Sequence, residues 1–457
     1  MTSLTSAEPR RSDLLSGQRH LPLLTVPVPM ELLGPALEIG LEGLRARSGI
    51  AWERPGAGSA LFGFGVAAQV RGRRSSSLGE ARLPLAELMR DSAAGAIDPE
   101  ARPRAFGGGR FAPWGTRKDS RWDAFGGWEF TVPELLVAIA GDQVSASLTM
   151  RGGSGPPGGD IRRAVDRLLG EGPDAVPTPT TDTGHSDAPL ESGEWQEIVA
   201  RALQEIGEGR YRKVVLARAL DISLTRARTG DILSALAERY PGCFVFKYER
   251  AGRAWLGASP ELLASVKRGR VEAVCLAGSR PRGAEAVEDD RLANELLSSA
   301  KEREEHELVR AAIATGIEPF CVSFEHSATP AVVRMANIQH LRTPFAGTLK
   351  AGANVLDIAA SLHPTPAVGG SPRAEALEAI DRLEGMDRGW YAGPIGWMDF
   401  AGDGEFAVGL RSGLVGPEGA RIYAGAGIVA GSNPANEYAE TETKLRPLLD
   451  SLASALR

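Results

Sequence analysis

The order of the predicted strands and helices most constrains how this chain can fold. Strands follow one another with short turns between them, and helices come in groups instead of alternating with single strands. Strands in hairpin order form antiparallel sheets, whereas strict alternation with helices predicts a parallel sheet or a barrel. We therefore expect an α+β fold in which large antiparallel β-sheets form a two-layer sandwich, with helices packed outside.

Apolar periodicity and turn residues place these elements along the chain. Strands are predicted at 61–70, in a hairpin at 128–150, in a meander formed by 213–224, 242–250, 255–267 and 271–276, and within 319–350 and 390–429. Helices are predicted at 195–207, within 285–317, and at 353–361, 373–385 and 434–455. A meander places consecutive strands side by side in one sheet.

A polar stretch at residues 172–194 divides the chain. It contains almost no large apolar residue, which is typical of an exposed linker. We expect residues 21–171 to form the N-terminal part of the sheet system and residues 195–457 to carry the functional site. Residues 1–20 are polar and are expected to form a flexible N-terminus.

Charge and cysteine content exclude several classes of function. Lysine and arginine total 52 against 58 for aspartate and glutamate, a net charge of -6, whereas nucleic-acid binding needs a basic face. No segment approaches the roughly 20 apolar residues that cross a bilayer. The three cysteines are far apart, which gives no disulfide framework and no zinc knuckle. We expect a cytoplasmic protein with reduced thiols and neither a nucleic-acid nor a membrane partner.

The C-terminal helix carries the first candidate site. It begins at Pro434, and Glu437, Glu440 and Lys444 follow at i, i+3 and i+7, on an arc of roughly 60°. Two carboxylates side by side repel each other unless a cation lies between them. A solvated helix face with a weak ion pair is the alternative. The small residues of AGAGIVAGS just before this helix favour a ligand, because they allow close approach to backbone N–H groups.

A second carboxylate cluster, KEREEHE, occupies residues 301–307. Such a run usually forms a wet helix surface. Glu305 is the candidate for facing inward, because Leu308 and Val309 begin the apolar side just beyond it. Glutamates from two helices with open water positions would suit Mg²⁺.

Lys213 and Glu261 are candidates for acid–base chemistry. Lys213 opens the apolar strand KVVLAR, where a lysine either extends to solvent or, if buried, loses its proton near neutral pH. Glu261 lies between a proline and two leucines, where apolar surroundings raise the pKa of a carboxyl group. A turn carboxylate at a strand start is the alternative for Glu261.

The histidines do not indicate a metal site. His340 and His363 occur in motif-like contexts, NIQHL and LHPTPAVGG, but a lone histidine is more often a hydrogen-bonded core residue. No HExxH spacing is present, which argues against zinc chemistry. Phosphate-loop and GxSxG motifs are also absent from the sequence.

Taken together, these segments resemble the chorismate-utilising enzymes, which include isochorismate, salicylate, anthranilate and aminodeoxychorismate synthases. The matching blocks cover nearly all of residues 195–455 and are highly specific as an ordered set. The blocks are KVVLAR (213–218), GASPELL (257–263), LAGSRPRG (276–283), KEREEH (301–306), NIQHL (337–341), LHPTPAVGG (362–370), EFAVGLRS (405–412) and AGAGIVAGSNPANEYAETETK (424–444). The N-terminal segment matches only loosely.

The resemblance implies a site for chorismate and Mg²⁺ within residues 195–457. It implies that Glu305 and Glu440 hold the metal and that Glu437 supports it through water. One substrate carboxylate would be neutralised by the metal. The groups implied to bind the other carboxylate, or to line the pocket, are Tyr391, Arg411, Lys444 and the backbone at Gly425 and Gly427, together with Gly278, Ser279 and His340.

A few residues indicate which reaction within the family to expect. Relatives that use ammonia typically have glutamine at the position of Lys213, so lysine implies water as the nucleophile, with Lys213 as its base. Glu261 would protonate the departing C4 hydroxyl. Ala277 stands where aminodeoxychorismate synthases often carry a nucleophilic lysine. Ala367 stands where salicylate synthases tend to have threonine, which favours stopping at isochorismate.

The resemblance therefore implies an isochorismate synthase activity that serves menaquinone or siderophore synthesis, with the N-terminal segment closer to the menaquinone type. Two alternatives stay open. One is a salicylate synthase, and the other is a catalytically inactive relative that only binds its ligand. A monomer is expected, without a glutaminase subunit.

Overall fold

The structure is a computed structural model. It describes residues 22–90, 92–94, 99–152, 158–170, 192–224, 228–334 and 338–455. The expected flexible N-terminus at residues 1–20 lies outside these ranges, as does most of the expected linker at 172–194. Residues 192–194 are described, and they already belong to a helix.

Twelve strands of the described residues form the larger of two sheets. Neighbouring strands run antiparallel, except for the last pair at one edge. In spatial order the strands are β18 (Gly370–Ser371), β10 (Lys213–Ile222), β22 (Gly419–Val429), β21 (Ser412–Gly416), β12 (Arg253–Ser259), β11 (Phe244–Arg250), β2 (Ile50–Arg54), β3 (Ser59–Phe64), β8 (Leu135–Ala140), β9 (Gln143–Arg151), β1 (Leu23–Pro27) and β5 (Ala93–Ala94).

The smaller sheet is antiparallel throughout the described residues. Its strands in spatial order are β15 (Cys321–His326), β17 (Ile338–Leu349), β14 (Arg270–Pro281), β13 (Leu262–Lys267), β20 (Gly404–Val408), β19 (Pro394–Asp399), β6 (Arg104–Gly109), β7 (Trp128–Val132) and β4 (Ala68–Arg71). A short additional strand, β16 (Ala331–Arg334), pairs with β17.

The α-helices of the described residues vary widely in length. They are α1 (Gly34–Arg47), α2 (Arg82–Arg90), α3 (Gly158–Gly170), α4 (Ser192–Gly207), α5 (Thr229–Arg239), α6 (Ala286–Ser298), α7 (Ala300–Ile317), α8 (Val355–Leu362), α9 (Arg373–Leu383) and α10 (Pro434–Ala455). In these ranges, none of the helices combines the length and the apolar character that a membrane span requires.

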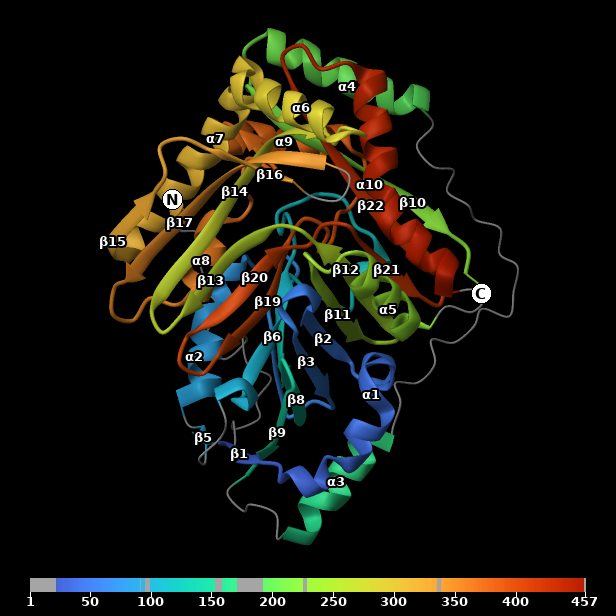
Figure 1. Cartoon of the computed structure of the whole chain (residues 1–457), viewed down its shortest axis with the longest axis vertical. Helices are drawn as coiled ribbons and strands as arrows, with labels where there is room; N and C mark the ends of the chain where they lie inside the picture. Colours follow the sequence, from blue (N-terminus) through green and yellow to red (C-terminus); the bar gives the residue numbers. More distant parts are fainter. Residues whose placement is uncertain are drawn as a thin grey trace, which may run out of the picture.

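Helices pack on the outer sides of the two sheets (Figure 1). On the larger sheet, α10 packs against β22, and α5 packs against β11 and β12. On the smaller sheet, α7 packs against β14 and β17, and α8 packs against β13. This arrangement confirms the expected α+β fold with large antiparallel sheets and outer helices.

Both halves of the chain contribute strands to both sheets. In the larger sheet, β2 of the N-terminal segment pairs with β11 of the C-terminal segment. In the smaller sheet, β6 pairs with β19. The N-terminal segment therefore adds strands to the same sheet system, as expected, instead of forming a sheet of its own.

Three predicted strand regions are corrected, because the chain passes from one sheet to the other inside them. Residues 255–267 form β12 in the larger sheet and β13 in the smaller one, with Pro260 and Glu261 between them. Residues 128–150 contain β7 in the smaller sheet and the hairpin β8–β9 in the larger one. The strand expected at 61–70 ends at Phe64, and β4 begins at Ala68 in the other sheet. Apolar residues lie on both sides of each crossing, so the sequence predicts each region as a single strand or hairpin.

The predicted meander of residues 213–276 is also corrected. β10 and β11 are not neighbours, because β22, β21 and β12 lie between them in the sheet. The connection contains α5, a helix that the sequence reading missed. Its buried residues Ile232, Leu233 and Leu236 follow helical spacing, but the helix is only 11 residues long.

Aromatic side chains fill the space between the two sheets. Trp122 and Trp255 are fully buried and meet edge to face, with ring centroids 5.0 Å apart. Phe125 bridges Trp122 and Trp390 in the same cluster. This rigid core fixes the strand ends and turns that carry the candidate site.

Candidate active site

Lys213 and Glu305 form an ion pair at the start of β10. Lys213 is 2% exposed, and its Nζ lies 2.7 Å from Oε1 of Glu305 on α7. Burial would raise the pKa of Glu305, but the charge and the hydrogen bond of Lys213 outweigh it and leave this pKa below its usual value. The structure therefore places the predicted base in the interior and the predicted metal ligand facing it.

Gly427 keeps space open beside this pair. It lies on β22, opposite Val215 of β10. A Cβ atom at this position would lie 3.2 Å from Cε of Lys213 and 3.8 Å from Oε1 of Glu305. A larger residue would therefore crowd the ion pair. The close approach of a ligand to backbone N–H groups, which the small residues before α10 favour, stays a prediction.

Glu261 lies at the crossing between the two sheets. Burial raises the pKa of its carboxyl group to about 7, although the charges of Lys213, Lys444 and Arg411 oppose this rise. The side chain makes no hydrogen bond with any residue that the structure describes. A carboxyl group that is partly protonated at neutral pH and has no protein partner can donate a proton to a ligand.

A β-bulge in β14 presents the residues predicted to lie near the metal or the ring. The register against β17 shifts between Ala277 and Ser279, and Gly278 between them has a φ of 76°, which favours glycine. The Ser279 amide donates to Oε2 of Glu302 on α7 at 2.9 Å. Sequence reasoning did not single out Glu302 within the KEREEHE run and missed this anchoring contact.

His340 faces Ser279 across the same strand pair. The Ser279 Oγ and the His340 Nδ1 lie 2.7 Å apart. Burial, assisted by the charges of Arg411 and Lys444, lowers the pKa of His340 to about 4, so the ring is neutral near pH 7. A neutral ring can form hydrogen bonds in the site without adding charge.

Arg411 and Tyr391 carry polar groups that have no protein partner. Burial lowers the pKa of Arg411, and the charge of Tyr391 opposes this effect. Among the described residues, the Arg411 guanidinium and the Tyr391 hydroxyl form no hydrogen bond or ion pair. The φ of Arg411 is 49°, which is unfavourable for a residue other than glycine. The surrounding structure therefore holds its backbone in a strained conformation.

Gly425 joins these groups to the C-terminal helix. Its carbonyl oxygen accepts a hydrogen bond from Lys444 Nζ at 2.9 Å. A Cβ atom at Gly425 would lie 3.4 Å from the Tyr391 hydroxyl. The Tyr391 ring stacks on Tyr423, with centroids 5.0 Å apart and planes at 13°. Lys444, Gly425 and Tyr391 are therefore together, as the sequence predicted.

The three predicted metal ligands do not form a closed cluster. Glu305 pairs with Lys213, while Oε1 of Glu440 lies 2.5 Å from Lys444 Nζ. Glu437 is 8% exposed, and its pKa is raised by burial and by the charge of Glu440, against a hydrogen bond from Ser432. In the part of the chain that the structure describes, no three His, Cys, Asp or Glu side chains could hold a metal ion.

The donor chemistry of these residues still fits Mg²⁺. Carboxylate oxygens from α7 and α10 are the ligand type that this ion prefers, and it keeps several of its waters. Burial is the main cause of the raised pKa of Glu437, and the charge of Glu440 adds to it, so a cation beside Glu437 would favour its charged form.

Two further residues of the LHPTPAVGG motif, Ala367 and His363, pack in or against the core. Ala367 lies on the turn between α8 and β18, packs against the core, and makes no polar side-chain contact. His363 is a buried core histidine whose Nε2 lies 3.1 Å from the Phe111 carbonyl oxygen. Burial lowers the pKa of His363 to about 3. His363 thus follows the ordinary behaviour of a lone histidine.

Sequence reasoning missed the buried pair that positions this turn. Arg388 donates to the carbonyl oxygens of Val368 at 3.1 Å and Val215 at 2.7 Å, and it pairs with Glu384. Glu384 also accepts the Ala217 amide at 2.7 Å. The only signal was the charged run DRLEGMDR before the predicted strands from residue 390, and a charged run usually indicates a wet surface.

One cavity borders α7. It has a volume of about 660 Å³ and is lined by Arg212 and Glu304, the sequence neighbours of Lys213 and Glu305, but by none of the predicted site residues. Adjacent residues of a strand point to opposite faces, so this cavity is not the space in front of the ion pair.

Comparison with known proteins matches residues 35–453 to the family described as chorismate binding enzyme. The salicylate biosynthesis isochorismate synthase of Pseudomonas aeruginosa is 35% identical over 410 residues, covering 88% of this chain and 84% of that protein. The isochorismate synthase MenF of Bacillus subtilis is 35% identical over 358 residues, covering 78% and 76%.

Solved structures share the fold. The menaquinone-specific isochorismate synthase MenF from Escherichia coli has a TM-score of 0.72 at 24% identity, covering 96% of this chain and 97% of that one. Anthranilate synthase component I from Streptococcus pneumoniae has a TM-score of 0.69 at 21% identity, covering 86% and 92%.

The pKa of Glu261 leads to a prediction about stability. Because the folded-state pKa of about 7 exceeds the ordinary 4.5, Glu261 stabilises the fold at low pH and loses this contribution as pH rises through 7. We expect the Tm of Glu261→Gln, relative to the unsubstituted chain, to increase between pH ~5 and ~8. Thermal unfolding at several pH values measures it. Glu272→Gln, at an exposed strand position, is the control. The same pH-independent difference for both variants would contradict the assignment.

Proposed function

Because the chain belongs to the chorismate-binding enzyme family, we propose that it is an isochorismate synthase. It converts chorismate to isochorismate by adding water at C2 and releasing the C4 hydroxyl as water. The observation that carries the proposal is that a buried lysine and a carboxyl group with a raised pKa belong to the same site. Lys213 is buried and charge-paired, and its charge acts on Glu261, whose pKa is raised to about 7.

Acid and base roles follow from these environments. When substrate is bound, the ion pair with Glu305 opens and the Lys213 ammonium loses its proton to solvent. Neutral Lys213 then takes a proton from the attacking water. Glu261 gives a proton to the departing hydroxyl group. One proton is accepted and one is donated, while the ring double bonds shift. The reaction therefore balances as an isomerisation.

Substrate binding is assigned to the groups without protein partners. Arg411 offers a planar fork of N–H donors, which suits a carboxylate, and the Tyr391 hydroxyl lies near Gly425. Lys444 adds a positive charge close to the same strand. Gly278, Ser279 and neutral His340 form another wall, and a neutral wall suits an uncharged ring better than a charged one would.

We also propose that the reaction needs Mg²⁺. Glu305 and Glu440 would hold it, with Glu437 acting through water. When bound, the ion would neutralise a carboxylate of chorismate. The fit of the donor set supports this assignment, as does the raised pKa of Glu437 beside Glu440.

The wider role is proposed from the relatives. We propose that isochorismate enters menaquinone or siderophore synthesis. The likeness to a solved menaquinone-specific enzyme and to a relative named for salicylate biosynthesis supports both routes. We further propose a cytoplasmic monomer without a glutaminase subunit. Three free cysteines suit a reducing compartment, and lysine at position 213 removes the need for ammonia.

Product analysis tests the proposed reaction. Incubation with chorismate and Mg²⁺, followed by chromatographic separation, should yield isochorismate and no pyruvate, because Ala367 replaces the threonine that is typical of salicylate synthases. Fluorescent salicylate with equimolar pyruvate would instead identify a salicylate synthase. Bound chorismate that is never turned over would identify an inactive relative.

Replacing Lys213 tests the base. Lys213→Ala should reduce turnover by about 10²–10⁴-fold while chorismate binding is mostly retained, because general-base catalysis contributes in that range. Lys213→Gln keeps a donor for Glu305 and guards against misfolding. Lys267→Ala, at an exposed position on β13, is the control. Steady-state kinetics and calorimetry measure the two effects, and near-normal turnover in Lys213→Gln would remove Lys213 as the base.

Replacing Glu440 tests the metal site. Glu440→Gln should raise the Mg²⁺ concentration for half-maximal activity by at least about tenfold, because a charged ligand is lost. Asp450→Asn, an exposed carboxylate on the same helix, should leave it unchanged. A magnesium titration of Glu440→Gln that overlays that of the unsubstituted enzyme would contradict the ligand role.

A further inference from the structure

An arginine-rich cavity lies away from the candidate active site. Its volume is about 150 Å³, and four arginines line it together with Trp122 and Asp123. Arg71 ends β4, Arg73 and Arg74 come from the segment after it, and Arg110 follows β6. The cavity is thus formed where the loops at one end of the smaller sheet meet.

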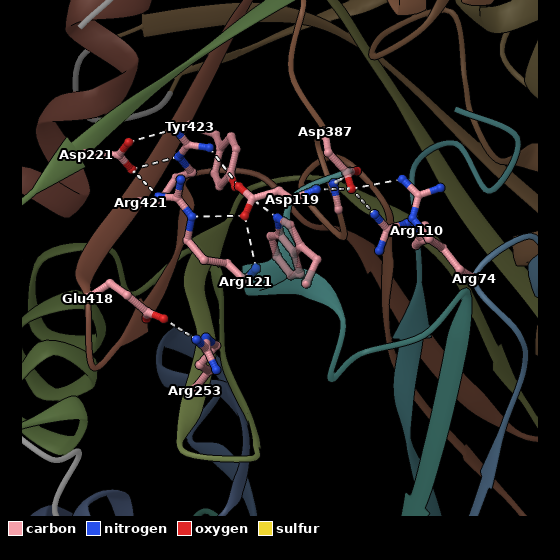
Figure 2. Close-up of polar contacts among 12 residues, drawn as sticks. Arg74, Arg110, Asp119, Arg121, Asp221, Arg253, Asp387, Glu418, Arg421 and Tyr423 are labelled. Atoms are coloured by element: carbon pink, nitrogen blue, oxygen red, sulfur yellow. Dashed lines mark hydrogen bonds and ion pairs between the residues drawn. The ribbon is translucent and has the colours of Figure 1, made fainter. Parts of the chain in front are cut away.

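Positive charge exceeds negative charge around this cavity. Arg74 and Arg110 share one carboxylate, that of Asp387 (Figure 2). Arg71 lies 3.6 Å from Glu129, a buried carboxylate that also pairs with Arg250. The Arg73 side chain forms no hydrogen bond or ion pair with any residue in the described ranges. Asp123 is the only acidic residue among those that line the cavity.

A neighbouring cluster shows what balanced pairing looks like in this chain. Arg121 and Arg421 face Asp119 and Asp221, two positive side chains against two negative ones (Figure 2). The groups around the cavity lack such a balance. Because buried like charges repel, the arrangement favours an additional anion.

A buried donor also lacks an acceptor here. Arg110 is 3% exposed, and its Nε atom has no hydrogen-bond partner among the described residues. The Trp128 Nε1 is likewise buried and unpartnered, and it lies against Gly72, which lines the cavity.

We propose that this cavity binds a small tetrahedral oxyanion of the phosphate class. Such an anion accepts hydrogen bonds from arginine side chains, and its charge complements the arginine excess around the cavity. A volume of 150 Å³ corresponds to about five liquid waters at ~30 Å³ each, enough for one oxyanion but not for a nucleotide.

The bound anion would join three separate parts of the chain. Arg73 and Arg74 belong to the segment after β4, Arg110 belongs to the segment after β6, and both Arg74 and Arg110 reach Asp387 ahead of β19. Trp122, which lines the cavity, also donates through Nε1 to the Tyr423 hydroxyl at 3.0 Å. Occupancy should therefore stabilise the contact between the N-terminal and C-terminal segments.

Calorimetric titration of the full chain with inorganic phosphate in chloride buffer tests the site. We expect saturable binding of one phosphate per chain and a rise in Tm. Arg73→Gln should weaken binding about threefold or more, as for a solvent-accessible charge. Arg110→Gln should weaken it by at least about tenfold, as for a buried charged donor. Arg90→Gln, an exposed arginine on α2, should bind like the unsubstituted chain.

The binding results for these variants decide whether phosphate occupies this cavity. Because Arg73 is exposed and unpaired, Arg73→Gln should fold normally, so the test stands even if Arg110→Gln does not fold. No saturable binding, or equal affinity in Arg73→Gln and the unsubstituted chain, would overturn the proposal, and the second result would place phosphate elsewhere, such as at Arg411. Glycerol phosphate, titrated in parallel, distinguishes a free anion from a phosphate ester, since binding of either at this site supports the shared chemistry.

Discussion

The ion pair between Lys213 and Glu305 is the constraint on which the rest of the site depends. A lysine that is 2% exposed can keep its charge only if a carboxylate reaches it, and Glu305 does so at 2.7 Å. This contact fixes α7 against the start of β10. Once α7 is placed, Glu302 can hold the Ser279 amide at the bulge of β14. One buried charge pair therefore positions two walls of the site.

Three other side chains of the site differ from this ion pair, because no described protein group binds their polar atoms. Glu261, Arg411 and Tyr391 make no hydrogen bond or ion pair through their side-chain polar atoms within the described residues. Burial raises the pKa of Glu261 and lowers that of Arg411, because it makes the charged form of each side chain less favourable. A dianionic ring compound would supply the missing partners. In this view the fold holds the site at some cost to stability, and the substrate offsets that cost.

Local sequence patterns predicted the fold class and most of the elements, including the exact span of α10. They failed where the chain changes sheet, because the apolar runs on either side of Pro260 and Glu261 predict one strand region, although β12 and β13 belong to different sheets. The site residues were found by motif, and the structure brings Lys213 to Glu305 and Ser279 to His340. Arg388 could not be found this way, because its partners are backbone carbonyl oxygens that are distant in the sequence. Helical spacing within one segment likewise gives no distance between Glu305 and Glu440, because these two residues lie on different helices.

The central claim is that a buried lysine directs water onto one carbon of the ring while Glu261 releases a hydroxyl group from another. Mass spectrometry of isochorismate formed in water labelled with heavy oxygen tests this most directly. Incorporation of one heavy oxygen atom at C2, from solvent, is the expected result. A product that carries only the original oxygen of chorismate would mean that the hydroxyl group migrates within the molecule, and neither Lys213 nor Glu261 would then have the role given to it here.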